Sequence, residues 1–291
     1  MASAVVLGVY ACLSIWLGGI VFAVLCALAS GGFIYEWLRM IVRYPTAPAP
    51  GQVAAGRPPF AHFLVSIAVS FLVGGAALFV AENAGIWAAV FAFLSAILVV
   101  AVALYESWQR GTSHGLYIRL VLALAGLLLA LAVGIVPVFA RIMPEVGVYI
   151  VTWMFAVVWT TDIAAYFSGR GIGGPKLWPQ VSPNKTWAGM IGGTLAGTAA
   201  GVVVWQIAIW QEAVAPLPLL PVLLLSIVAS LVGQGGDLAE SALKRKVGVK
   251  DSGSLIPGHG GVMDRLDAFS TVCLLTGILH IVGGLPFPLS M

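Results

Sequence analysis

Charged side chains are scarce in this sequence. Of its 291 residues, 14 are Lys or Arg and 11 are Asp or Glu, which is 9% of the chain, whereas about a quarter of a typical soluble domain is charged. Hydrophobic residues make up 60%, and the mean hydropathy is +1.04. The composition therefore excludes a soluble globular domain and predicts a polytopic membrane protein. The formal net charge is only +3, and we expect no nucleic-acid partner.

Cysteine is also rare. The three cysteines, Cys12, Cys26 and Cys273, all lie within apolar runs. An odd number without a spacing pattern argues against a disulfide framework and against a zinc site. We therefore expect these residues to be small core or lipid-facing side chains.

Apolar windows long enough to cross the roughly 30 Å hydrocarbon core of a bilayer recur along the chain. They cover residues 3–43, 60–81, 85–105, 117–138, 147–168, 188–211, 217–243 and 264–285. The first window is too long for one helix, and Gly18 and Gly19 offer a break within it. We therefore expect nine transmembrane helices, with eight as the alternative. A signal peptide cleaved near Ala29 is disfavoured, because the apolar run is too long and no basic region precedes it.

Basic residues gather on one side of the membrane if the spans alternate strictly. When the loop after the first window is placed in the cytoplasm, 13 of the 14 Lys and Arg residues lie on that side, and only Arg141 lies opposite. This distribution follows the positive-inside rule. We therefore expect the polar loops 169–187 and 244–263 to face the cytoplasm, and a bacterial chain to lie in the inner membrane.

The residues with obvious chemistry lie in the second half of the chain. Residues 1–145 contain apolar spans and a Pro- and Gly-rich linker at 44–59, and we expect them to form a scaffold or an interface. Residues 146–291 add acids at membrane depth and both motif loops. We expect this second part to be a catalytic transmembrane domain.

Three spans of the second half carry acids. Asp162 lies within one apolar window, with Tyr166 one helical turn later, and Asp237 follows Gln-Gly-Gly in the next-to-last span. Asp264 and Asp267 open the last span. A carboxylate at membrane depth is costly and is usually functional or paired. We expect these acids to converge at one cytoplasm-facing pocket.

Some of these acids also have a structural interpretation. Asp162 could form an ion pair with Arg170 instead of binding a ligand. Asp267 could be a helix-start residue that satisfies free backbone amides. Glu240 is expected to be solvated or to pair with Lys244, four residues later on the same helix.

The two motif loops combine basic residues with glycines and prolines. In loop 169–187, Lys185 is flanked by hydroxyl residues, and the backbone is expected to be irregular, with amides available to anions. In loop 244–263, a basic cluster precedes a glycine-rich segment that contains His259. Both loops therefore predict phosphate binding. Simple interfacial loops with snorkelling lysines, or docking on anionic lipid headgroups, are the alternatives.

Two segments resemble a known family. The segment SALKRKVGVKDSGSLIPGHGGVMDRLD, residues 241–267, resembles the signature of the CDP-diacylglycerol synthases, or phosphatidate cytidylyltransferases. The segment DIAAYFSGRGIGGPKLWPQVSPNKTWAGMIGG, residues 162–193, is similar to the second block of that family. The resemblance covers most of residues 150–285, whereas the first half is similar only in its hydrophobic helices and a Glu-Trp pair. Ala188 departs from the Glu or Gln that is common in the family, which puts an essential side chain there in doubt.

The resemblance implies a reaction in which CTP and phosphatidate give CDP-diacylglycerol and pyrophosphate. It implies an all-α polytopic fold with a polar cavity in the C-terminal half. It also implies Mg²⁺ bound by Asp237 and Asp264, and it suggests a second, monovalent cation such as K⁺. CTP, phosphatidate and the bilayer are the expected partners, and a homodimer is an open alternative.

The motif positions and the residue chemistry together define the expected site. Catalytic roles are expected for Asp237, Asp264, Lys185, Lys250 and Arg265. Roles in substrate binding are expected for Asp162, Tyr166, Ser182, Asn184, Thr186, Lys244, Arg245, Asp251, His259, Gly260, Gly261 and Asp267. A lipid kinase, which would have to activate a neutral alcohol, and a transporter with charges at mid-membrane are the competing classes.

Overall fold

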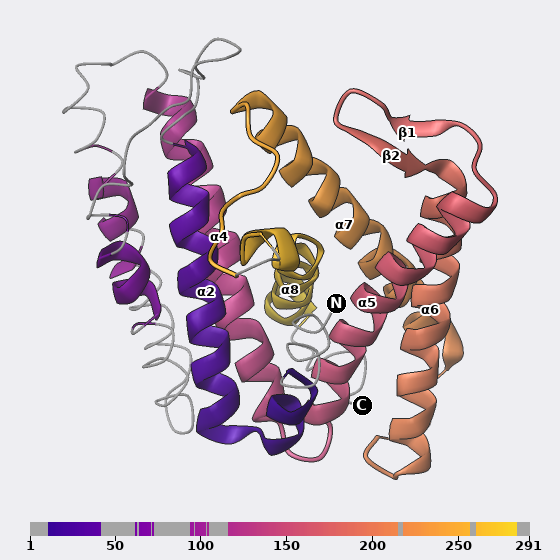
Figure 1. Cartoon of the computed structure of the whole chain (residues 1–291). Coiled ribbons are helices and arrows are strands. Elements are labelled where there is room, and N and C mark those ends of the chain that lie inside the picture. Colours follow the sequence, from indigo (N-terminus) through magenta and orange to yellow (C-terminus); the bar gives the residue numbers. More distant parts are fainter. Residues whose placement is uncertain are drawn as a thin grey trace. The chain divides into compact units, whose positions relative to one another are not determined.

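A computed structural model describes most of the second half of the chain and parts of the first. The described residues are 11–41, 62, 64–70, 72, 94–95, 97–102, 104, 116–214, 218–256 and 260–283. Within them lie the helices and strands labelled in Figure 1: α2 (Gly19–Ile41), α4 (Leu116–Arg141), α5 (Gly147–Gly171), β1 (Lys176–Trp178), β2 (Ser182–Thr186), α6 (Trp187–Trp210), α7 (Leu219–Lys246) and α8 (Met263–Gly283).

The six helices of the described part are each long and apolar enough to cross a membrane. The chain is therefore a mostly helical integral membrane protein, as its composition predicts. The expected spans over 60–81 and 85–105 fall largely outside the described residues, so the count of nine helices stays a prediction. The expected cytoplasm-facing cavity stays a prediction as well.

The break expected within the first apolar window is confirmed. Residues 11–17 are helical, and α2 begins at Gly19. At this junction, Gly18 and the first residue of α2, Gly19, have φ angles of 63° and 54°. Glycine adopts this left-handed conformation without the steric penalty that a side chain would impose.

The chain divides into two compact units. The first contains residues 1–139 and 243–266, and the second contains residues 140–242 and 267–291. The signature segment thus belongs almost entirely to the first unit, together with α2. The expected division into residues 1–145 and 146–291 concerns function and stays a prediction.

In the first unit, α2 packs against α4 (Figure 1). Ser30 Oγ donates to Ala130 O at 2.7 Å, and Trp37 Nε1 donates to Leu122 O at 2.8 Å. Polar contacts of this kind between membrane helices contribute about 0.6 kcal/mol each on average. The indole ring of Trp37 lies directly over Gly126, where a Cβ would overlap it. The result is a rigid, buried position for the middle of α2.

In the second unit, a row of glycines on α6 lets this helix pack closely against α5 (Figure 1). A Cβ at Gly189 would lie 2.8 Å from Ala165 O, and a Cβ at Gly193 would lie 2.8 Å from Thr161 O. Gly197, four residues further along, is equally close to α5. Small residues at intervals of four permit this close approach of two backbones in a membrane.

Hydrogen bonds then join α7 to the other helices of the second unit. Ser230 Oγ lies 2.8 Å from Thr161 Oγ1 of α5, and Gln234 Nε2 donates to Thr194 Oγ1 of α6 at 3.0 Å. Thr271 Oγ1 of α8 donates to Val232 O at 3.2 Å. The stretch of α7 that precedes Asp237 is therefore held from three sides.

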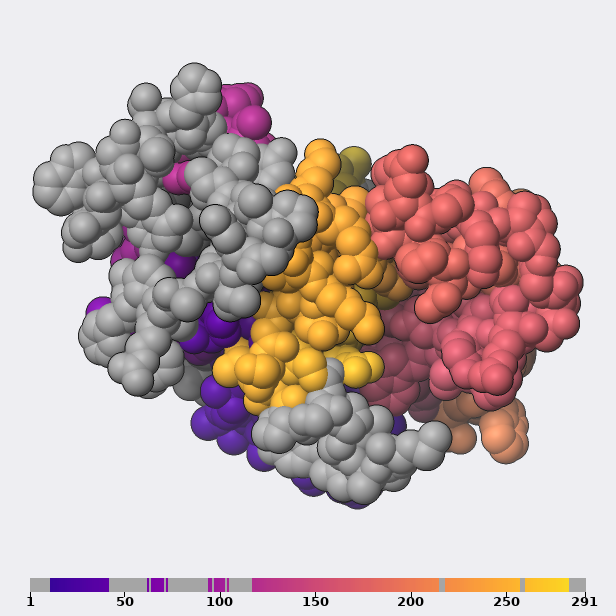
Figure 2. All heavy atoms as spheres, turned by 45° about the horizontal axis from the view of Figure 1, so that its top comes forward, coloured from indigo at the N-terminus to yellow at the C-terminus, as the bar shows by residue number. Residues whose placement is uncertain are grey.

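The loop between α5 and α6 is more ordered than its composition predicts. Strands β1 and β2 form an antiparallel hairpin in which Lys176 pairs with Thr186 and Trp178 with Ser182. The register shifts between these two pairs, and such an irregularity accommodates Pro183, which has no N–H to donate. The expectation of an irregular backbone in this loop is therefore wrong for residues 176–178 and 182–186. Figure 2 shows the hairpin, in salmon, at the surface of the molecule.

Candidate functional site

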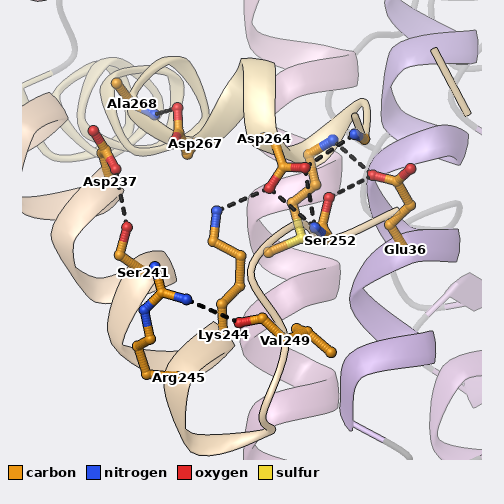
Figure 3. Close-up of polar contacts among 12 residues, drawn as sticks. Glu36, Asp237, Ser241, Lys244, Arg245, Val249, Ser252, Asp264, Asp267 and Ala268 are labelled. Carbon is orange, nitrogen blue, oxygen red and sulfur yellow. Dashed lines mark hydrogen bonds and ion pairs between the residues drawn. The ribbon is translucent and has the colours of Figure 1, made fainter. Parts of the chain in front are cut away.

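In the second unit, the structure brings two of the expected catalytic residues together. Lys185, on β2, donates from Nζ to Asp237 Oδ2 of α7 at 2.5 Å. The other carboxylate oxygen of Asp237, Oδ1, accepts a bond from Ser241 Oγ at 3.3 Å (Figure 3). The side chains of Lys185 and Asp237 are 28% and 27% exposed. The ion pair is therefore accessible to a ligand.

Asp162 and Tyr166 lie on exposed positions of α5. Asp162 interacts electrostatically with both Asp237 and Lys185. Arg170 Nη1 donates instead to the Tyr166 hydroxyl at 2.9 Å. The alternative Asp162–Arg170 ion pair is not found among the contacts of the described residues. Asp162, Asp237 and Lys185, three expected site residues of the second unit, thus act on one another electrostatically.

The hydroxyl residues of β2 have different environments. Thr186 is buried, and its Oγ1 accepts a hydrogen bond from Gly189 N at 3.0 Å, which makes it the N-cap of α6. Such a cap stabilises a helix by about 1 kcal/mol. Ser182 is half-buried and Asn184 is exposed. Thr186 therefore has a structural role, whatever further contact it makes with a substrate.

In the first unit, Asp264 is the acceptor for a set of converging donors (Figure 3). Lys244 Nζ donates to Oδ1 at 2.8 Å, and Gly261 N donates to Oδ2 at 2.9 Å. Ser252 N lies 3.1 Å from Oδ1 and 3.0 Å from Oδ2. The side chains of Lys244 and Asp264 are only 10% and 12% exposed, so this ion pair is more deeply buried than the pair formed by Lys185 and Asp237.

The other expected residues of the signature segment lie around these contacts. Arg245, Lys250, Asp251 and Arg265 have exposed side chains, and Arg245 Nη1 donates to Val249 O at 3.4 Å. Figure 2 shows this part of the chain, in orange, at the surface. Exposed basic side chains can bind phosphate groups without first breaking buried contacts.

The end of the signature segment contains Gly260 and the start of α8. Gly260 has a φ angle of 82°, and its carbonyl oxygen accepts from Ile256 N at 3.0 Å. His259 lies outside the described residues, and its expected role stays a prediction. Asp264 occupies the first turn of α8, whereas Asp267 lies in the following turn and accepts a bond from Ala268 N at 2.8 Å.

Glu36 is not among the expected site residues, yet it contacts the signature segment directly. It lies on α2 and is fully buried, and its Oε2 accepts bonds from Ser252 Oγ at 2.8 Å and Met263 N at 3.0 Å (Figure 3). One signal was available in the sequence, because a carboxylate in an apolar run is costly and needs a partner. The partner itself lies 216 positions away along the chain and has no signal in the spacing.

Asp237 of the second unit and Asp264 of the first unit each have a carboxylate suitable as a ligand for Mg²⁺. Within the described residues, His, Cys, Asp and Glu side chains form no group of three or more that could hold a metal by themselves. Mg²⁺ is, however, usually bound by one or two carboxylates together with substrate phosphates. Asp237 and Asp264 offer hard oxygen donors, and each is oriented by hydrogen bonds, as metal ligands commonly are.

Comparison with known proteins shows the family. The sequence matches the model of the Cytidylyltransferase family over residues 1–282. It is 36% identical to a phosphatidate cytidylyltransferase of Brucella suis biovar 1 (strain 1330) over 281 residues, which is 94% of this chain and 89% of the relative. The phosphatidate cytidylyltransferase of Bacillus subtilis (strain 168) is 42% identical over 129 residues, covering 44% of this chain and 46% of the relative. The chain therefore belongs to the cytidylyltransferase family.

Proposed function

We propose that this protein transfers the cytidylyl group of CTP to phosphatidate. A phosphate oxygen of phosphatidate attacks the α-phosphorus of CTP, and the bond from that phosphorus to the bridging oxygen of the β-phosphate breaks. The products are CDP-diacylglycerol and pyrophosphate, and the bond electrons leave with pyrophosphate. The names of the relatives support this choice of substrates.

The observation that carries the mechanism is that one lysine of each motif segment is paired with an aspartate. Lys185 binds Asp237, and Lys244 binds Asp264. The nucleophile is already an anion, so no strong general base is required. The barrier comes instead from the repulsion between two polyanions and from the charge on the leaving pyrophosphate. Cationic side chains held in fixed positions lower a barrier that arises from such negative charge.

Asp237 and Asp264 are the residues that would hold Mg²⁺. When bound, Mg²⁺ supplies charge stabilisation for the triphosphate and the leaving group. A cation at either carboxylate would compete with the paired lysine, because both need the same oxygens. Lys185 and Lys244 would then exchange these carboxylate bonds for bonds to phosphate oxygens. A second, monovalent cation such as K⁺ is part of the proposal only through the family resemblance.

The remaining basic residues position the substrates. Arg245, Lys250 and Arg265 are exposed and can donate to the phosphates of CTP or of the lipid. Asp162 interacts electrostatically with Lys185, and Asp251 follows Lys250 in the sequence. These two acids limit how tightly a simple anion binds to the neighbouring lysine. In this proposal the site faces the cytoplasm of a bacterial inner membrane, where CTP is available. A homodimer stays an open alternative.

One experiment with two labels tests the reaction class. Purified protein is incubated with phosphatidate, Mg²⁺ and CTP labelled either at the α- or at the γ-phosphate, and the lipids are extracted. We expect the α-label in the lipid fraction and the γ-label in pyrophosphate. A lipid kinase would instead place the γ-label in the lipid, and a transporter would place neither label there. Either of these outcomes refutes the proposal.

A further inference from the structure

The most unusual buried group outside the proposed catalytic set is the carboxylate of Glu36. Its side chain is fully buried on an apolar helix, and its Oε1 has no hydrogen-bond partner in the described part of the chain. A buried carboxylate with only one satisfied oxygen is costly. Its presence therefore needs an explanation in what the other oxygen does.

Oε2 of Glu36 holds two points that are distant in sequence from α2. It accepts the Ser252 hydroxyl at 2.8 Å and the Met263 backbone N–H at 3.0 Å. Met263 is the first residue of α8, and the first N–H groups of a helix have no acceptor within the helix. Glu36 therefore caps α8 from a different helix and fixes Ser252 at the same time.

The same backbone also positions Asp264. Ser252 donates its N–H to the Asp264 carboxylate and its hydroxyl to Glu36. On the other side of the loop, Gly261 N donates to Asp264, and Met263 N donates to Glu36. The two acids thus hold the same two flanks of the loop, residues 252–256 and 260–263, which pair through Ile256 N and Gly260 O at 3.0 Å.

The loop flanks pack closely against the Glu36 carboxylate. A Cβ at Gly253 would overlap Glu36 Oε1, and a Cβ at Gly261 would overlap both Glu36 Oε2 and Ser252 Oγ. The loop flanks therefore approach Glu36 at backbone distance, which only glycine permits. A shift of the Glu36 carboxylate has to move these flanks.

We infer that Glu36 is a positioning residue, which holds the loop flanks against α2 and through them orients the Asp264 carboxylate. This inference rests on the proposed metal-binding role of Asp264. It assigns to the N-terminal half of the chain a direct part in the geometry of the site. Loss of outer-shell partners of this kind typically costs about 10- to 100-fold in metal affinity or activity.

The test compares four variants of the full-length protein. Glu36→Ala removes both bonds to the loop flanks, Ser252→Ala removes only the hydroxyl bond, and Glu36→Gln keeps an oxygen acceptor but removes the charge. Ser30→Ala is the matched control. Ser30 is also fully buried on α2, and within the described residues its hydroxyl bonds Ala130 O of α4 at 2.7 Å and not the loop flanks.

Two measurements are made on each variant. The first is hydrogen exchange of peptides that cover the loop flanks, on protein without added metal. The second is the Mg²⁺ concentration that gives half-maximal activity, with kcat and the KM for CTP. For Glu36→Ala we expect exchange at least about tenfold faster and a Mg²⁺ requirement raised about 10- to 100-fold. Ser252→Ala should shift both in the same direction, and Ser30→Ala should shift neither.

Glu36→Gln separates positioning from a direct charge effect. Because the amide oxygen can accept both bonds, this variant should stay within about threefold of the wild type. If it is as impaired as Glu36→Ala, or if Glu36→Ala and Ser252→Ala leave exchange and the Mg²⁺ requirement unchanged, the inference is wrong. If Glu36→Ala does not fold, Ser252→Ala carries the test alone, since it removes a single hydroxyl.

Asp264→Asn distinguishes this inference from the proposed function. If Asp264→Asn keeps full Mg²⁺-dependent activity, the metal assignment fails, whatever the exchange data show. If Asp264→Asn is inactive while the Glu36 and Ser252 variants are normal in both measurements, only the positioning role fails.

Discussion

Lys185 Nζ lies 2.5 Å from Asp237 Oδ2, although the two residues are 52 positions apart in the chain. Strand β2 supplies the lysine and helix α7 the aspartate. Both residues are expected from the sequence to take part in catalysis, and the structure shows them as partners. Their pairing links the loop between α5 and α6 to the next-to-last helix.

Replacing Lys185 by Met should lower kcat/KM by about 10²- to 10³-fold, because a positioned cation next to the reacting phosphates is lost. The nucleotidyl-transfer assay with α-labelled CTP measures this change. Lys176→Met is the matched control, since Lys176 lies on the other strand of the same hairpin and is exposed. Similar losses in both variants would show that the hairpin acts only through its overall charge.

The two aspartates should differ in what they contribute to stability. Asp264→Asn breaks a buried ion pair with Lys244, whose side chains are 10% and 12% exposed, and should destabilise the protein by about 3 kcal/mol. Asp237→Asn breaks a pair that is 28% and 27% exposed and should cost about 1 kcal/mol or less. Both variants should lose Mg²⁺-dependent turnover.

Denaturant unfolding in detergent, followed by intrinsic fluorescence, compares these two variants with the wild type. Equal destabilisation of both would contradict the difference in burial between the two pairs. Normal turnover in both would contradict the metal assignment.

Close packing of α5 against α6 gives a third prediction. A Cβ at Gly193 would lie 2.8 Å from Thr161 O and 2.9 Å from Ala165 Cβ, so Gly193→Ala should force the helices apart and cost about 1–3 kcal/mol. Gly171→Ala is the control, because a Cβ at Gly171 would meet nothing within 4 Å. Thermal unfolding in detergent should show a lower Tm for the first variant only. An unchanged Tm for Gly193→Ala would mean that the helix interface is loose.

The sequence predicts well those features that depend on local composition. The break at Gly18 and Gly19 follows from two residues that tolerate a positive φ. The roles expected for Asp237 and Asp264, which rest on the cost of a charge at membrane depth and on the motif, stay predictions. Both residues are found in lysine pairs with several oriented donors.

Features that depend on contacts between distant segments are not predicted. Loop 169–187 contains glycines and prolines that favour irregular backbone, but the pairing of Lys176 with Thr186 is a cross-strand contact that composition does not encode. Glu36 is an acid within an apolar run, but its bond to Ser252 joins segments 216 positions apart. Only the fold brings such residues together.

The last prediction concerns orientation in the membrane. With 13 of 14 Lys and Arg residues on one side and Arg141 opposite, the positive-inside rule places the end of α4 outside and the end of α7 inside. In a protein whose three cysteines, Cys12, Cys26 and Cys273, are replaced by Ala, Arg141→Cys should react with a membrane-impermeant maleimide in intact cells. Lys246→Cys, at the exposed end of α7, should react only after the cells are permeabilised. The opposite pattern would place both motif loops away from the cytoplasm, where CTP could not reach them, and would contradict the proposed function together with the topology.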